Sequence, residues 1–195
     1  MRHAYSTIAD VSPSTAEREV NLLAALSLVL SDRVRYATEQ AAGHSSAAPA
    51  ALIALGEFLE GGSLDDLRRV VALTPSGAVR LVDRLEADGL VRRRPGSDAR
   101  AVALALTTAG RVAARRVLAA RSDALSGILD GLTTEERSSL TGIVEKLLSS
   151  IVSDRMAARE RGEDAGGGWL CRMCDFAACG RDEGNCPVAN LIANA

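Results

Sequence analysis

Residues 63–106 carry the pattern that most restricts the fold: two short helices, a tight turn between them and then a β-hairpin. Ser63 and Asp66 predict a helix start, because a serine can cap a helix while an acidic side chain three residues later bonds back to it. Thr74-Pro75 predicts a second start, since Thr caps well and Pro fits the first helical turn. Two helices joined so closely predict a helix-turn-helix.

A strand pattern follows the second helix directly. Residues 90–94 (LVRRR) and 100–106 (RAVALAL) read as strands on either side of the turn at 95–98 (PGSD). A hairpin in this place is the wing of a winged helix-turn-helix. The hydrophobic share of 47% comes mostly from Ala, Leu and Val with few aromatics, which suits helices packed on helices. We therefore expect a mainly α fold with a small β-hairpin wing and long dimerisation helices.

Longer helices are expected on both sides of this unit. Capping boxes at Ser14 with Glu17 and at Thr133 with Glu136 start two of them. These helices carry more apolar surface than one small domain can cover, and a symmetric second copy is the simplest cover. The expected organisation is an amino-terminal arm (1–13), a dimerisation helix (14–46), a winged helix-turn-helix domain (47–106), dimerisation helices (107–162) and a cysteine-rich tail (163–195), with 166–168 (GGG) as a flexible joint.

Basic residues gather on the second helix and the hairpin. The formal net charge of the whole chain is −2, so a nucleic-acid site must be a local patch. A run of arginines is usually a solvated surface, but this run falls on the wing of a helix-turn-helix, which favours contact with DNA. The residues expected to contact DNA are Thr74, Ser76, Gly77, Arg80 and Arg84 on the helix, and Arg92, Arg93, Arg94, Asp98 and Arg100 on the wing.

Four cysteines, the only ones in the chain, lie together in the tail as Cys171-x2-Cys174-x4-Cys179-x6-Cys186. Each lies a short loop from the next, so four sulfurs can converge on one inorganic centre. Glycines between them allow tight turns, and Trp169, Leu170 and Phe176 could wall the site from water. In a reducing compartment such a cluster of cysteines predicts ligands or a redox sensor rather than structural disulfides.

Three interpretations of the four cysteines remain open. An iron–sulfur cluster, [2Fe-2S] or [4Fe-4S], is favoured, since all-cysteine ligation is usual for both. A four-cysteine zinc site is the alternative. A dithiol–disulfide switch without metal is the third. Under the first two, the metal could merely fold a tail that has too little apolar surface to fold alone.

The stretch 73–110 resembles the recognition helix and wing of the MarR family of bacterial transcription regulators. The motifs DRLEADGLVRR (83–93) and LTTAGR (106–111), with the Asp98-x-Arg100 pair between them, carry the resemblance. The likeness extends over residues 14–160. It implies a homodimer that binds double-stranded DNA at a pseudo-palindromic operator, usually as a repressor. It also implies that Arg100 enters the minor groove, that Asp98 orients a nearby arginine, and that the first and last two helices form the dimer interface.

The tail departs from this family's pattern, which puts a small phenolic ligand in doubt and directs attention to the cysteines. We expect a regulator whose DNA affinity is controlled by a cluster sensing redox state, nitric oxide or iron. A regulator with a purely structural zinc site and an electron-transfer protein are the alternatives. No catalytic constellation is visible, so an enzyme is not expected. No signal peptide or membrane span is recognised, so we expect a cytoplasmic protein without membrane contact.

Overall fold

The computed structural model describes residues 14–45, 47–96, 102–163 and 166–193. Helices dominate this part of the chain, and its two strands form one antiparallel sheet, which confirms the expected mainly α fold with a hairpin wing. The elements are α1 (Thr15–Ala42), α2 (Ala48–Glu57), α3 (Leu64–Val71), α4 (Pro75–Ala87), β1 (Val91–Pro95), β2 (Val102–Leu106), α5 (Thr108–Leu129), α6 (Thr134–Glu160), the 3-10 helix η1 (Leu170–Met173) and α7 (Pro187–Ala193).

Local signals fix where the helices begin. The capping boxes predicted at Ser14, Ser63 and Thr133 are all present, with each side chain accepting a hydrogen bond from the backbone three residues later. Thr74 and Thr107 cap α4 and α5 in the same way. These bonds satisfy backbone donors that have no partner within the helix, so short sequence patterns determine the starts.

The helix-turn-helix and the wing share one core with the first half of α5. Strand β1 pairs with β2 from Val91 opposite Leu106 to Pro95 opposite Val102. Leu104 of β2 also forms two backbone hydrogen bonds with the α2–α3 connection. Its carbonyl oxygen accepts one from the N–H of Gly61 at 2.8 Å, and its own N–H donates one to the carbonyl oxygen of Gly62 at 2.9 Å. The largest fully buried apolar side chains of this core are Leu52, Ile53, Leu55, Leu67, Val70, Val82, Leu85, Val91, Leu104, Leu106 and Val117.

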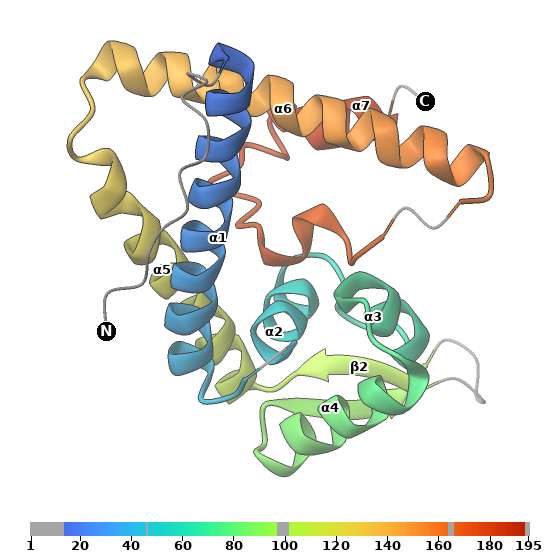
Figure 1. The fold of residues 1–195 in the computed structure, drawn as a ribbon. Helices are drawn as coiled ribbons and strands as arrows, with labels where there is room; N and C mark the ends of the chain where they lie inside the picture. Colours follow the sequence, from blue (N-terminus) through green and yellow to red (C-terminus); the bar gives the residue numbers. More distant parts are fainter. Residues whose placement is uncertain (1–13, 46, 97–101, 164–165, 194–195) are drawn as a thin grey trace, which may run out of the picture.

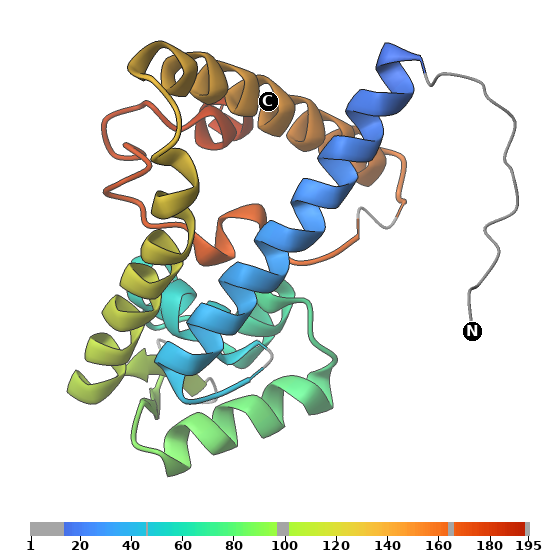
Figure 2. The ribbon, with the colours of Figure 1, turned by 60° about the vertical axis from the view of Figure 1, so that its left-hand side comes forward.

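The long helices extend upward from this unit in the views of Figures 1 and 2. Helix α1 packs along α5, α6 runs across near their upper ends, and α7 packs against α6. The segment that contains the cysteines runs between α6 and α2. Among the described residues, no helix combines the length and the apolarity that a bilayer crossing needs.

Gly110 lies against the backbone of Leu90, which leads into the wing, and it gives a test of the core. A Cβ at this position would lie 1.9 Å from the carbonyl oxygen of Leu90. We expect Gly110→Ala to lower the free energy of unfolding by about 1–3 kcal/mol, because the helix or the turn must move aside. Urea denaturation measures this loss.

The matched control is Gly127→Ala, where nothing lies within 4 Å of the added Cβ. This change should leave stability unchanged or raise it by about 0.5–1 kcal/mol, because alanine suits a helix better than glycine. Equal stability of the Gly110→Ala variant and the unaltered protein would contradict the described packing of α5.

Candidate functional site

The exposed face of α4 is the predicted DNA-reading surface. Ala78, Val82 and Leu85 point into the core, which leaves Ser76, Arg80 and Arg84 exposed on the opposite side at a spacing of four residues. Thr74 accepts a hydrogen bond from the backbone N–H of Gly77 at 3.2 Å and so caps the helix. The structure therefore gathers the predicted α4 residues on one helix end and one polar face.

The wing arginines have different surroundings. Arg92 is exposed. The Arg93 guanidinium donates to the carboxylates of Asp83, at 2.6 Å, and Glu86, both on α4. The hydrogen bond to Asp83 raises the pKa of Arg93, while partial burial opposes it. Arg93 thus ties β1 to the recognition helix, a role that the sequence analysis did not foresee.

Of the remaining wing residues predicted to contact DNA, the structure describes only Arg94. Arg94 forms an ion pair with Glu60 at 3.6 Å. Asp98 and Arg100, which were expected at the wing tip, lie outside the described residues. Their expected contacts with DNA stay predictions.

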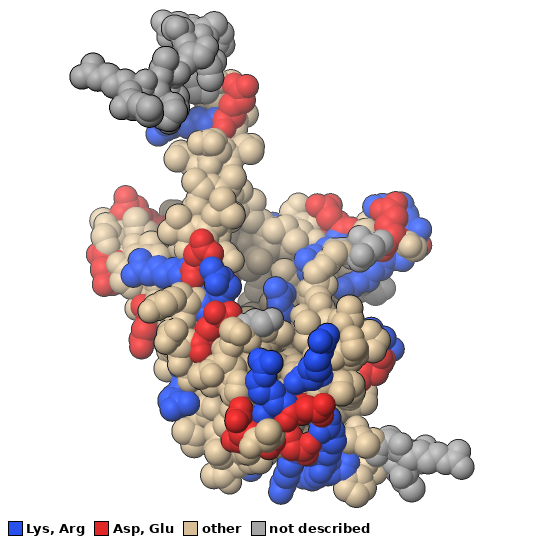
Figure 3. Space-filling model, turned by 60° about the horizontal axis from the view of Figure 1, so that its bottom comes forward, with Lys and Arg blue, Asp and Glu red and all other residues tan. Residues whose placement is uncertain are grey.

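Charges of both signs surround α4. Figure 3 views the molecule toward its lower side in Figure 1, where α4 lies, and shows basic and acidic side chains interleaved there. This surface is not a uniform basic patch. Acidic neighbours and DNA phosphates therefore compete for its arginines.

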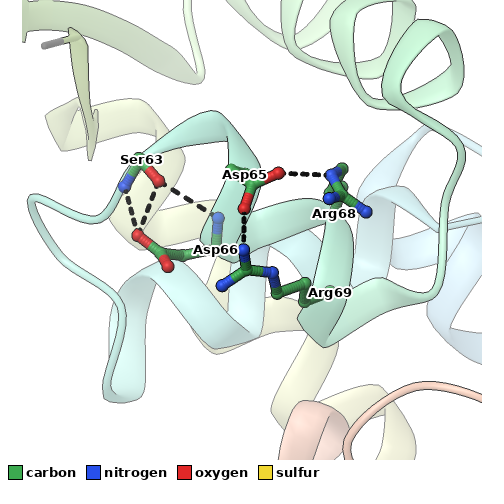
Figure 4. Close-up of polar contacts among 5 residues, drawn as sticks. All are labelled: Ser63, Asp65, Asp66, Arg68 and Arg69. Atoms are coloured by element: carbon green, nitrogen blue, oxygen red, sulfur yellow. Dashed lines mark hydrogen bonds and ion pairs between the residues drawn. The ribbon is translucent and has the colours of Figure 1, made fainter.

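Helix α3 adds two arginines that the sequence analysis missed. Arg68 and Arg69 both pair with Asp65, three and four residues earlier (Figure 4). In the same turn, Ser63 donates two hydrogen bonds to the Asp66 carboxylate, at 2.6 and 3.0 Å, and these lower the pKa of Asp66. The spacing of four residues from Asp65 to Arg69 is the signal that would have identified the pair.

The cysteines form two pairs in contact. Cys171, in η1, and Cys174, which ends it, are hydrogen-bonded through their side chains, and Cys179 and Cys186 form the second such pair. The bond from Cys174 lowers the pKa of Cys171 to about 6, although burial opposes it and nearby Arg181 adds to it. The same bond and burial raise the pKa of Cys174 far above its ordinary value.

The two pairs are also near each other. Burial raises the pKa of Cys179 to about 11, with further contributions from its bond to Cys186 and from the charges of Cys186 and Cys171. Within residues 14–45, 47–96, 102–163 and 166–193, no three His, Cys, Asp or Glu side chains surround one point closely enough to hold a single metal ion. The sulfurs are therefore paired and adjacent, but not closed around one centre.

Apolar and basic groups enclose this set of sulfurs. Cys186 is buried with Val152 of α6 and Val188 of α7, and Leu170, Cys171 and Cys179 pack on the same group. The guanidinium of Arg181 lies 4.5 Å from the centre of the Phe176 ring. Arg121, from α5, favours the thiolate of Cys174. Two arginines thus face a site whose thiolates would carry negative charge.

Local backbone conformation brings the cysteines together. Gly180 and Gly184 have φ of 63° and 75°, as expected of glycines that turn the chain tightly. The sulfur of Cys186 accepts a hydrogen bond from the backbone N–H of Ala189 at 3.5 Å. This bond belongs to the start of α7, a helix that the sequence analysis did not predict although Pro187 is a usual first residue of a helix.

The aromatic residues of the tail lie differently from the sequence expectation. Leu170 packs beside the cysteines, but Trp169 and Phe176 both stack with Phe58, just beyond α2. Gly168 is buried against α3 instead of serving as a free joint. Residue spacing does not indicate these contacts, because Phe58 lies more than one hundred residues before either ring.

Comparison with known proteins places the fold in a family. No protein-family model matches the sequence. The chain is 31% identical over 117 residues to the HTH-type transcriptional repressor MdtR of Bacillus subtilis, covering 58% of this chain and 76% of MdtR. It is also 31% identical over 86 residues to the uncharacterised HTH-type transcriptional regulator YwhA of the same organism, where the match covers 44% of this chain and only 62% of YwhA.

A solved structure gives the same result. The MarR-family transcriptional regulator of Silicibacter pomeroyi superposes with a TM-score of 0.51 at 29% identity, covering 65% of this chain and 87% of that regulator. The chain belongs to the MarR family of winged helix-turn-helix transcriptional regulators.

Proposed function

We propose that the protein is a homodimeric, DNA-binding repressor whose affinity for a pseudo-palindromic operator is set by an iron–sulfur cluster held by Cys171, Cys174, Cys179 and Cys186. The observation that carries the regulatory part is the meeting of all four sulfurs, in two adjacent pairs, in a segment packed against both α2 and α6. The repressor assignment follows the name of MdtR.

The reading surface supports binding to the major groove. Helix α4 presents Ser76, Arg80 and Arg84 on its exposed face, and its first turn carries only small side chains beside Pro75. Arginine can bond bidentately to a guanine edge, while serine suits a base or a phosphate. Arg92 is exposed on strand β1 of the wing, from which a phosphate could be reached.

Two copies are needed to cover the apolar surface of the long helices. Along α1, only Thr38 and Ala42 are buried, and along α6 only Val152. The exposed large hydrophobic side chains of these two helices are Val20, Leu22, Leu23, Leu26, Leu28, Val29, Tyr36, Leu140, Ile143, Val144, Leu147 and Ile151. A second copy would bury this surface and place two α4 helices about one turn of DNA apart, roughly 34 Å.

The dimer is tested by placing a charge in this surface. Leu26, on α1, is 48% exposed in the single chain. We expect Leu26→Glu to raise the dimer dissociation constant at least about 100-fold, because the dimer would bury an unpaired carboxylate from each copy. Sedimentation analysis should show a monomer where the unaltered protein is a dimer.

Ala87→Glu serves as the control, since it adds the same charge at an exposed position on α4, outside the helices proposed to form the interface. This variant should remain dimeric. A dimeric Leu26→Glu variant would reject α1 as part of the interface.

The cluster is favoured over a single zinc ion by the placement of the sulfurs. One tetrahedral ion draws four sulfurs to about 2.3 Å from a single point. The structure instead shows two separate contacts, with no three donors around one point in the described part of the chain. A centre several ångströms across, with iron and sulfide inside it, matches two pairs better.

Metal analysis of anaerobically purified protein tests this part. The proposal expects iron and acid-labile sulfide, with a brown colour and absorption in the visible range. Colourless protein that contains one zinc per chain would support the zinc alternative. Operator affinity is then compared with the cluster intact, oxidised and removed, and equal affinity in all three states would exclude the sensor function.

A further inference from the structure

One short backbone segment connects the dimerisation helices with the helix-turn-helix. The carbonyl oxygen of Gly168 accepts a hydrogen bond from Arg155 of α6 at 3.2 Å. The next residue, Trp169, donates its backbone N–H to the carbonyl oxygen of Val70 of α3 at 2.9 Å. The approach is so close that a Cβ on Gly168 would lie 2.3 Å from the same Val70 oxygen. A single residue step in the tail therefore joins α6 to α3.

An aromatic clamp forms the second connection. The ring of Phe58 stacks with that of Trp169, with centroids 5.8 Å apart and planes at 1°, and with that of Phe176, with centroids 5.4 Å apart and planes at 8°. These three residues are all the Phe and Trp of the chain. The carboxylate of Glu57 accepts the backbone N–H of Phe176 at 2.9 Å. Stacked rings and a charged acceptor together hold the tail on the end of α2.

The clamp is built from the residues that the cysteines position. Trp169 lies two residues before Cys171, and Phe176 lies between Cys174 and Cys179. The positions of the Trp169 and Phe176 rings therefore depend on how η1 and the following turn are folded. That fold has little apolar surface of its own, and ligation of the cysteines would supply its stability.

We propose that Trp169 and Phe176 form a latch that closes on Phe58 when the four cysteines are ligated, and thereby fixes α3 and α4 relative to α6. This inference rests on the proposed function and names its mechanical link. With the cysteines ligated, the clamp holds the reading helix in one orientation on the dimer. With the cysteines unligated, the tail loses its fold, the clamp opens and the orientation is released.

The latch predicts two specific losses of hydrogen-exchange protection. The backbone N–H groups of Trp169 and Phe176 are bonded to Val70 and Glu57 only when the latch is closed. We expect peptides that cover 169–176 to exchange at least about tenfold faster after the iron is removed by a chelator, while peptides of α5 stay unchanged. Equal exchange of 169–176 in both states would overturn the proposal.

Two variants separate the latch from the ligation itself. Phe58→Leu removes the stacking ring but keeps an apolar side chain, and Gly168→Ala forces the tail away from Val70. Neither touches a cysteine, so both should bind iron, and circular dichroism confirms that each is folded. Gly127→Ala is the control, because its added methyl group meets open space.

Operator affinity is measured for each protein with iron bound and after its removal. We expect the affinity of the unaltered protein and the Gly127→Ala control to change about tenfold or more, and that of both latch variants to change less than about twofold. If the iron-bound latch variants keep the full change in operator affinity when iron is removed, the latch is rejected while the proposed function stands. Absence of iron, or of any change in affinity, in the unaltered protein would instead reject the proposed function.

Discussion

Replacing Cys179 by serine is expected to weaken retention of the metal centre at least about 100-fold, since loss of a group that only supports a ligand already costs about 10–100-fold. Cys179 lies in the turn between the two ends of the tail and is paired with Cys186. Serine keeps the size of the side chain but binds soft metals poorly. Iron and sulfide analysis after desalting measures the loss.

Ala178→Ser is the matched control, because it adds a hydroxyl at an exposed neighbouring position and leaves all four sulfurs in place. This variant should keep its iron. The Cys179→Ser variant should also show the operator affinity of chelator-treated unaltered protein, because both lack the centre. Full iron content after serine replacement of each cysteine in turn would disprove ligation by these four residues.

The second large effect is expected at Arg80 on the reading helix. We expect Arg80→Ala to weaken specific operator binding by about 1–3 kcal/mol, roughly 5- to 150-fold, and to relax the preference at one base pair of each half-site. Arg80 is exposed, and its Nε lies 3.3 Å from the carbonyl oxygen of Ser76. This contact holds the guanidinium along the helix end that would enter the groove.

The measurement is a fluorescence anisotropy titration at fixed salt, with an operator that the unaltered protein selects from a randomised duplex pool. Arg159→Ala provides the control, because it removes the same charge from the last turn of α6, far from α4 in both ribbon views. The control should bind nearly as well as the unaltered protein. Equal weakening by both variants would show that Arg80 contributes only general charge.

Local patterns made most of the DNA-binding unit predictable. Helix starts at Ser14, Ser63, Thr74, Thr107 and Thr133 depend on hydrogen bonds within three residues, so the sequence alone indicates them. The strand pair of the wing also follows from alternation and a turn between neighbouring segments. The four cysteines were recognisable because their spacing is short.

Other features needed contacts that spacing does not encode. Arg93 is a predicted DNA contact, and β1 also places it beside two carboxylates of α4, which no spacing in the sequence indicates. The tail looked like an appendage on a glycine joint, but it bonds to α2 and α3. Helix α7 is short and has little pattern of its own, and it packs against α6.

The sequence by itself determined the helix-turn-helix, the wing and the presence of a four-cysteine segment, because these depend on neighbours along the chain. Only the tertiary structure decided that this segment lies between α6 and the helix-turn-helix. The hydrogen bond from Phe176 to Glu57 joins residues 119 positions apart. Such a contact forms only after the intervening helices have packed, since their packing brings the two ends together and offsets the entropy of closing so long a loop.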